Sequence, residues 1–163
     1  MKSRVTLSVL AALTAAGVLL PGALSAQAGP FQFHAITPCR VFDTRAVGAQ
    51  TNGNPLQNPG PHCFQVRGIC GVPPTAAAAT LNATITQPTR GGDLRLYPAS
   101  AIPGLNDPST MNYNAGEAAL ANGAILPLAT GGGCTNPDDM KILIGMIGSG
   151  TVHLIVDVTG YFE

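Results

Sequence analysis

The chain has 163 residues with eight basic and eight acidic side chains, so its formal net charge is zero. Without a basic surplus it lacks the electrostatic footprint of proteins that bind nucleic acid or anionic membranes. It has no tryptophan and only 5% aromatic residues, a composition that weakens the case for a sugar-stacking platform.

Residues 1–28 have the pattern of a secretory signal peptide. Lys2 and Arg4 form a charged start, residues 5–20 are an apolar run, and Ala26-Gln27-Ala28 supplies the small side chains that a signal peptidase needs. The run is short for a membrane span and is followed by a Pro-Gly pair, so we favour cleavage after Ala28 over an uncleaved membrane anchor. We therefore expect an exported protein, either secreted or held at the cell surface.

Extended segments begin soon after the expected cleavage site. Phe31–His34 alternates and predicts a first short strand, and Pro38–Arg45 predicts another with Val41 and Phe42 at its apolar centre. Residues 47–61 are rich in Gly, Asn, Gln and Pro with almost no apolar anchors. This composition predicts a long loop, and long loops often carry function or mobility.

The middle of the chain predicts a hairpin. Extended structure resumes over residues 63–67, and residues 71–74 turn the chain. Ala76–Thr86 is ambiguous, because its alanines favour a helix whereas its alternation of apolar residues with Asn and Thr favours a strand; we predict a strand. The turn-forming residues of Gln87–Asp93 then predict a hairpin whose return strand is Leu94–Tyr97.

Loops and short strands alternate in the next part of the chain. Pro98–Pro108 predicts a loop and Thr110–Tyr113 a short strand. Ala118–Leu128 fits either one helical turn or a strand, but its Gly and Pro argue against a long helix, and Ala124–Leu126 fits an edge strand. Gly131–Gly133 predicts a flexible turn.

The last two strands are the clearest in the sequence. Met140–Ile147 predicts a buried strand, and Gly148–Gly150 predicts a tight turn into Thr151–Phe162, so we expect the two strands to pair as an antiparallel hairpin. Thr151–Phe162 is the longest β-branched run of the chain. One of its faces is mixed and the other is uniformly apolar, which predicts a central strand whose removal unfolds the domain; the apolar face consists of Val152, Leu154, Val156 and Val158.

About eight short strands separated by turns predict an all-β fold, a single antiparallel β-sandwich of jelly-roll or immunoglobulin-like type. This domain, residues 29–163, keeps six basic and eight acidic side chains, for a net charge of −2, together with all four cysteines. An even number of cysteines in an oxidising compartment predicts two disulfides with three possible pairings, of which we favour Cys39–Cys70 and Cys63–Cys134. A zinc site is the alternative, but the spacings are irregular and no C-x-x-C pair occurs.

Three ordered stretches carry a family resemblance. They are Pro38–Arg45, the segment from Cys70 to Thr86, and Val156–Phe162; Gly92–Pro98 and Ser109–Tyr113 also fit. Together they resemble exported bacterial β-sandwich modules that begin with a D-T-R signature and end with a D-V-x-G-Y-F signature. The resemblance spans nearly the whole mature chain and implies a module that occurs alone, in tandem or appended to exported hydrolases and surface proteins. It implies no catalytic activity.

Asp43, Thr44 and Arg45 form the most suggestive polar cluster. A carboxylate, a hydroxyl and a guanidinium together can bind a sugar or a peptide carboxylate, because arginine offers a planar fork of donors. The alternative is architectural: Arg40 or Arg45 pairs with Asp43 or Asp157 and caps the end of the sandwich, since buried charges need partners. We favour the architectural interpretation.

The remaining polar residues offer weaker candidates. Asn82, Asn112 and Asn122 have short amides that we expect to bond backbone groups at strand ends or bulges. The carboxylate pair Asp138-Asp139 fits either a calcium-binding turn or an exposed polar turn, and we favour the latter.

The inventory for catalysis is thin. His153 and Asp157 are four residues apart on one strand, which places them on the same face but roughly 13 Å apart along it. A hydrolytic triad then needs Ser100, Ser109 or Ser149, none of which lies in a nucleophile-elbow context. No phosphate-binding loop or dinucleotide fingerprint is present in the sequence.

The sequence therefore favours a non-catalytic structural or interaction module of the cell exterior, without a cofactor. Its expected partners are other copies of itself, through strand edges, or other cell-surface proteins. The alternative is a glycan- or cell-wall-binding module that uses polar residues around the loops at 47–61 and 98–108. A hydrolase is the third and least favoured function.

Overall fold

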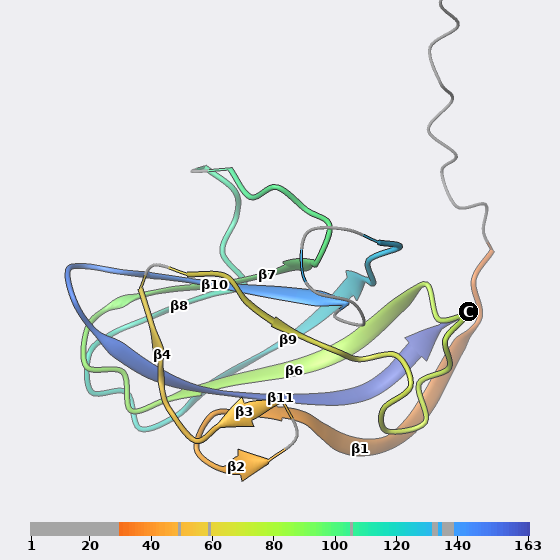
Figure 1. Cartoon of the computed structure of the whole chain (residues 1–163), viewed down its shortest axis with the longest axis horizontal. Helices are drawn as coiled ribbons and strands as arrows, with labels where there is room; N and C mark the ends of the chain where they lie inside the picture. Colours follow the sequence, from red (N-terminus) through yellow and green to blue (C-terminus); the bar gives the residue numbers. More distant parts are fainter. Residues whose placement is uncertain (1–29, 49, 59, 105, 132–133, 135–138) are drawn as a thin grey trace, which may run out of the picture. The chain divides into compact units, whose positions relative to one another are not determined.

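The computed structural model describes residues 30–163, apart from positions 49, 59, 105, 132–133 and 135–138. The predicted signal peptide and most of the expected 131–133 turn lie outside the described residues. Within the described residues every regular element is a strand (Figure 1), which confirms the all-β prediction. In this part of the chain no helix has the length and apolar character needed to span a membrane.

The longest strands form a first sheet. All its neighbouring strands are antiparallel, in the order β1 (Phe33–Asp43), β11 (Thr151–Phe162), β6 (Ala78–Thr86) and β9 (Leu120–Pro127). A short strand, β4 (Leu56–Gln57), pairs with the beginning of β11. The final strand is therefore central, as its sequence predicts, with β1 on one side and β6 on the other (Figure 1).

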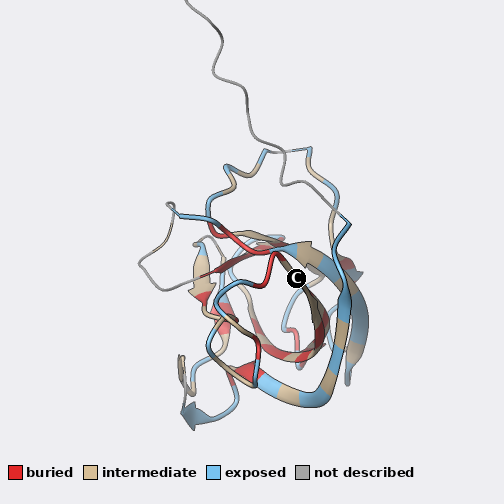
Figure 2. Ribbon diagram, turned by 90° about the vertical axis from the view of Figure 1, so that its right-hand side faces the viewer, coloured by how far each residue is buried: buried red, intermediate tan, exposed pale blue. Residues whose placement is uncertain are grey.

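The shorter strands form a second antiparallel sheet and a small ribbon. The sheet has the order β5 (His62–Phe64), β10 (Met140–Met146), β7 (Gly92–Pro98) and β8 (Met111–Tyr113). The ribbon pairs β2 (Val47–Gly48) with β3 (Thr51–Asn52). The two sheets form the layers of a β-sandwich, and the buried positions, red in Figure 2, gather between them.

The core forms where the apolar phases of the strands meet. On β11 every second residue from Val152 to Val158 is fully buried, as the alternation predicts. β6 and β10 contribute in the same way, and burying each large aliphatic side chain contributes about 1.5–3 kcal/mol; their innermost residues are Ala79, Leu81, Ala83, Ile85, Met140, Ile142 and Ile144.

Several segments predicted as strands or left ambiguous are strands with different ends. The two strands predicted over Phe31–His34 and Pro38–Arg45 are one strand, β1, because the intervening residues continue its pairing with β11 through an irregularity in register. The ambiguous segment Ala76–Thr86 contains β6, and Ala118–Leu128 contains β9 rather than a helical turn. β9 lies at the edge of its sheet, as its Gly and Pro predict.

Both predicted hairpins are wrong. β10 pairs with β5 and β7, whereas β11 pairs with strands of the first sheet, so residues 148–150 carry the chain from one sheet to the other. The turn at 87–93 likewise joins β6 in the first sheet to β7 in the second. Turn-forming residues specify that the chain reverses. They do not specify whether the two strands then share an edge or face each other across the core.

The segment 47–61 is more ordered than its composition predicts. It contains β2, β3 and β4, and Leu56 is a buried anchor that is only 3% exposed. Strand pairing uses backbone groups, which Gly, Asn and Gln supply as well as any residue, so a polar composition does not exclude it. The extended segment expected at 63–67 is the shorter strand β5.

Both expected disulfides are present. Cys39–Cys70, with a Cα–Cα distance of 5.8 Å, ties β1 to the turn that precedes β6. Cys63–Cys134, at 6.2 Å, ties β5 to the segment before β10. All four cysteines are therefore occupied in disulfides, and none is available as a zinc ligand.

Candidate functional site

Four charged side chains, two of them from the D-T-R triplet, form a network at the end of β1 and on the facing part of β11. Asp43 accepts hydrogen bonds from the Nε and Nη2 atoms of Arg45, at 2.9 and 2.8 Å, and from Nη1 of Arg40 at 3.1 Å. Arg40 also donates two hydrogen bonds, of 2.9 and 3.2 Å, to Asp157, which lies opposite it on β11. The predicted pairing of these four residues is confirmed.

The network favours the charged forms of Asp43, Arg40 and Arg45. Hydrogen bonds from Arg45, together with the charges of Arg45 and Arg40, lower the pKa of Asp43 to about 2 despite its partial burial. The hydrogen bond to Asp157 raises the pKa of Arg40, and the hydrogen bond to Asp43 raises that of Arg45. At neutral pH these side chains compensate one another, which is the behaviour of an architectural network.

Thr44 is separated from its neighbours in the triplet. It is 1% exposed, and its Oγ1 lies 3.0 Å from Nδ1 of His153 and accepts the N–H of Leu154 at 2.9 Å. The Thr44 hydroxyl thus fastens the end of β1 to β11, while the carboxylate of Asp43 and the guanidinium of Arg45 bond each other. The triplet has two separate roles and does not present three groups to one ligand.

Three of the residues weighed for hydrolysis, His153, Asp157 and Ser109, have other partners. Nδ1 of His153 contacts the Thr44 hydroxyl, and Asp157 binds Arg40. Ser109 donates to the side-chain oxygen of Asn112 at 3.1 Å. The structure gives these residues hydrogen bonds that hold strands and turns, and it does not bring them together as a triad.

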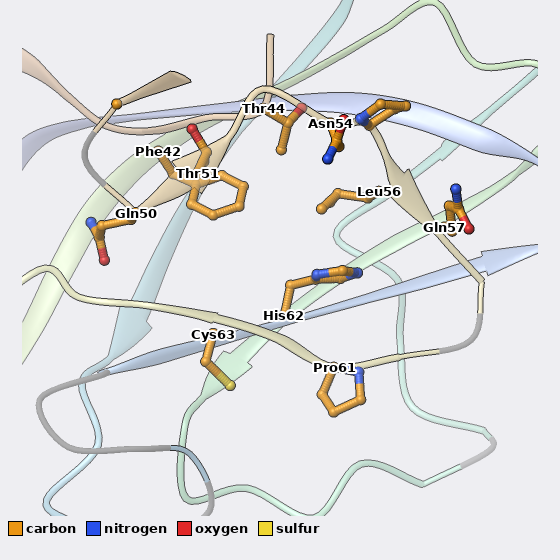
Figure 3. Close-up of a pocket in the computed structure, with 12 residues that line it drawn as sticks. Phe42, Thr44, Gln50, Thr51, Asn54, Leu56, Gln57, Pro61, His62 and Cys63 are labelled. Carbon is orange, nitrogen blue, oxygen red and sulfur yellow. The ribbon is translucent and has the colours of Figure 1, made fainter. Parts of the chain in front are cut away.

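An open groove of about 970 Å³ lies where the segment 47–61 crosses from the first sheet to the second. Figure 3 shows Phe42 and Leu56 in this groove, with the imidazole of His62 rising into it from β5. The sequence predicts a long loop for this segment, and the alternative glycan-binding hypothesis uses it. The remaining lining residues of the groove are Thr44, Gly48, Gln50, Thr51, Asn54, Pro55, Gln57, Pro61 and Cys63.

Two polar side chains of the groove bond the backbone of β1. The Gln50 amide donates to the carbonyls of Val41 at 2.7 Å and Gln65 at 3.0 Å, and it accepts the N–H of Gln65. The Thr51 hydroxyl lies 2.7 Å from the carbonyl of Asp43. One wall of the groove therefore also covers the outer edge of β1. Sequence reasoning missed this role, because a bond to a backbone carbonyl leaves no residue pattern.

His62 is the only one of the twelve lining residues that titrates near neutral pH. Burial lowers its pKa from 6.5, and a hydrogen bond with the backbone of Gln57 opposes that effect in part. The ring is therefore neutral at pH 7, with one nitrogen bonded to Gln57 and the other able to accept a hydrogen bond. The groove presents an apolar floor, neutral polar groups and no net charge.

Asp139 corrects both predictions for the Asp138-Asp139 pair. It is 4% exposed and forms an ion pair with Arg67 at 2.6 Å, and its other oxygen accepts the N–H groups of Val66 and Arg67 at 2.9 and 2.7 Å. With its oxygens committed to these donors, Asp139 is neither an exposed turn residue nor a calcium ligand. Asp138 lies outside the described residues, within which no cluster of three or more candidate metal ligands occurs.

The prediction that the three asparagines bond backbone groups is confirmed for one of them and wrong for two. The Asn122 amide donates to the Thr110 carbonyl at 2.6 Å, the backbone contact predicted for it, and so ties β9 to the start of the second sheet's edge strand. The prediction is wrong for Asn82, whose amide reaches the Thr84 hydroxyl in the middle of β6. It is also wrong for Asn112, whose side-chain oxygen accepts a hydrogen bond from the Ser109 hydroxyl and not from a backbone group.

The outer edge of β9 is the second candidate for an interaction site. β9 has eight residues, none of them charged, and in the described part of the chain β6 is the only strand that pairs with it. Ala121 and Gly123 are exposed and the side chain of Ile125 is 65% exposed. An uncharged edge of this length is able to pair with another strand.

These features define the class of protein: an antiparallel β-sandwich with two disulfides, a neutral groove beside one edge of its first sheet, and a free strand at the other edge. Comparison of the chain with protein-family models, curated proteins and solved structures found no match. The function is therefore argued from the groove and the edge.

Proposed function

We propose that the chain is an exported, non-catalytic interaction module of the cell exterior that associates with other copies of itself through the edge of β9. The observation that carries this proposal is that edge: eight residues without a charge, unpaired on the outer side among the described residues. Soluble β-proteins usually block such edges with lysine, proline, a bulge or a covering segment. β9 carries a proline only at its last position and pairs with β6 without a bulge, so the rest of its edge supports a role in pairing.

Three further observations support the module's setting. The two disulfides suit an oxidising compartment, which agrees with the signal-peptide pattern. Three of the residues weighed for hydrolysis, His153, Asp157 and Ser109, are bonded to other side chains. The low net charge of the mature chain offers little repulsion between copies.

The mass of the protein in solution tests the proposal. We expect the wild-type mass, measured by light scattering after size exclusion, to rise above that of a monomer as concentration increases. Ile125→Lys places a charge at the edge of β9 and should return the protein to a monomer. Ile147→Lys is the matched control, because Ile147 is also exposed, at 83%, and belongs to the turn after β10. A wild-type protein that stays monomeric at high concentration overturns the proposal.

The groove favours a second function, the binding of a neutral glycan. Its supporting observation is the pairing of an apolar floor, Phe42 and Leu56, with uncharged polar groups and the acceptor nitrogen of His62. Sugars offer hydroxyl donors and apolar ring faces that suit such a lining. The matched test is retention on insoluble polysaccharide and peptidoglycan: His62→Ala should lose it and His34→Ala, outside the groove, should keep it. No retention of the wild type on any matrix overturns this function.

A further inference from the structure

We infer that the partner of β9 is the β9 strand of a second copy, paired antiparallel about a two-fold axis that passes beside Gly123. The inference rests on the proposed function and specifies it: it names the partner strand, the direction of pairing and the register. The resulting first sheet would run without interruption through two copies.

The backbone groups available for pairing follow from two hydrogen bonds. The N–H of Leu128 donates to the carbonyl of Ala77 at 2.9 Å, so in this antiparallel ladder Leu128 faces β6 and alternate residues of β9 do the same. The residues between them, Ala121, Gly123 and Ile125, direct their N–H and C=O groups away from β6. Pro127 belongs to this outward set, where its lack of an N–H costs the first sheet no bond.

The opposite side of the sheet gives the same phase. Leu154 accepts the N–H of Thr44 at its carbonyl, at 3.0 Å, and so faces β1. Its neighbour Ile155 then faces β6, opposite Thr84. Thr84 consequently faces β11, and its partner on the other side, Ala121, faces outward. Two independent contacts thus assign the same outward residues.

This outward set is complementary to itself. When two copies of β9 pair antiparallel about Gly123, Ala121 of each copy lies opposite Ile125 of the other, and the glycines lie opposite each other. All three positions then form hydrogen-bonded pairs, which supply about six backbone hydrogen bonds. A two-fold contact of this kind uses the same patch on both copies and closes as a dimer.

The side chains fit this register. Ile125 is 65% exposed, and the opposing Ala121 is small enough to lie beside it and cover part of its apolar surface. Gly123 at the axis carries no side chain, and the space where a Cβ would stand is open, with its nearest neighbour, the Leu81 carbonyl, 4.0 Å away. Moving the axis to Ile125 would bring Pro127 into the ladder, where it has no N–H to donate.

The other edges are less suited to the same role. Those of the second sheet, β5 and β8, have three residues each. The second half of β1 is covered by Gln50 and Thr51 and carries charge at Arg40. Among the described residues β9 therefore offers the longest uncharged edge.

Single engineered cysteines test the register directly. The native cysteines are all in disulfides, so an added cysteine is the free thiol of the folded protein. Gly123→Cys should cross-link to its own kind with a short bifunctional thiol reagent, because opposed residues in hydrogen-bonded pairs lie about 5.5 Å apart. Ala121→Cys and Ile125→Cys should each fail to cross-link alone and should cross-link when the two variants are mixed.

The outcomes separate this inference from the proposed function. The predicted cross-links, with Ile147→Cys giving none, support the two-fold register. A wild-type protein that associates although Gly123→Cys stays uncross-linked overturns the inference and leaves the proposed function standing. Self-cross-linking of Ala121→Cys indicates a parallel or shifted pairing and likewise overturns the inference. A wild-type protein that is monomeric at every concentration overturns both.

Discussion

The two edge strands of the first sheet, β1 and β9, differ in what covers their outward backbone groups. The carbonyls of Val41 and Asp43 on β1 accept hydrogen bonds from Gln50 and Thr51, and the disulfide Cys39–Cys70 lies against the same strand. In the described part of the chain β6 is the only strand that pairs with β9, and no second strand lies on its outward side. One sheet therefore has one sealed edge and one open edge.

This difference shows that an edge can be closed without another strand. The sealing side chains come from the polar segment 47–61, which also forms a wall of the groove. A substitution that weakens the seal should therefore alter both the stability of β1 and the shape of the groove. At the opposite edge of the same sheet, β9 is uncharged and has no second strand beside it. The two edges of the sheet are therefore protected to different degrees.

The largest expected effect comes from removing the disulfide Cys39–Cys70, which holds β1 covalently. Replacing Cys39 and Cys70 together by serine should lower the free energy of unfolding by about 3–4 kcal/mol, because the disulfide restrains a long loop of the unfolded chain. Denaturant unfolding measures the change, and hydrogen exchange should show the loss of protection along β1. The Cys63→Ser, Cys134→Ser double variant is the control: we expect a similar loss of stability without the selective exposure of β1. A loss below about 1 kcal/mol would contradict the prediction.

The next effect comes from the side-chain part of the seal. Gln50→Asn keeps an amide and a residue that tolerates the positive φ of 70° at this position, but the shorter side chain cannot reach Val41 and Gln65 together. We expect a loss of about 2 kcal/mol from the broken bonds, measured by denaturant unfolding. The control Gln57→Asn, on the exposed rim of the groove, should change stability by less than about 0.5 kcal/mol. Equal effects of the two variants would argue against the seal.

The charged network beside the sealed edge should have a smaller effect. The solvent screens the half-exposed arginines, so Asp43→Asn should lower stability by about 1–2 kcal/mol. The pKa of Asp43 is about 2 in the folded chain and 3.8 for an ordinary aspartate, so its contribution is complete above pH 3.8 and is lost as pH falls toward 2. Acid titration of the unfolding midpoint measures this, with Glu117→Gln as a control outside the network. An Asp43→Asn variant whose unfolding midpoint depends on pH as that of the wild type does would contradict the prediction.

The smallest effect concerns the groove. Burial lowers the pKa of His62 in the folded chain, so the unfolded chain binds its proton more readily. Stability is therefore unaffected by His62 above pH 6.5 and declines slightly as pH falls below that value toward the lowered pKa. His62→Gln should remove this decline, whereas His34→Gln should retain it. Denaturant unfolding at a series of pH values measures the decline, and NMR titration of the wild-type imidazoles measures the pKa of His62 directly. A His62 pKa above 6.5 would contradict the prediction.

Patterns that depend on one strand were predictable from the sequence. The apolar phase of β11 identifies the central strand, and the scarcity of charges makes the pairing of Arg40 with Asp157 the natural expectation. The even number of cysteines predicts two disulfides, and the favoured one of the three possible pairings is confirmed. In each case the deciding information lies within one short segment or in the number of residues of a kind.

Features that depend on how segments meet were not predictable. The turn at 148–150 reads as a hairpin, yet it joins two sheets, because the residues of a turn do not record which edge the next strand will meet. Asp139 looks exposed beside Asn and Pro, and its partner Arg67 lies 72 positions away. The seal by Gln50 was missed for the same reason: its acceptors are backbone atoms.

The pairing of the first strand, β1, with the last strand, β11, determines how the fold responds to tension. Gln32 and Glu163 exchange backbone hydrogen bonds of 2.7 and 3.1 Å, so a force that pulls these two residues apart acts across the ladder and opens it one rung at a time. Such unzipping needs far less force than sliding the strands past each other. On the β1 side the tear reaches Cys39, where the covalent link to Cys70 carries the load into the body of the sandwich and halts the peeling.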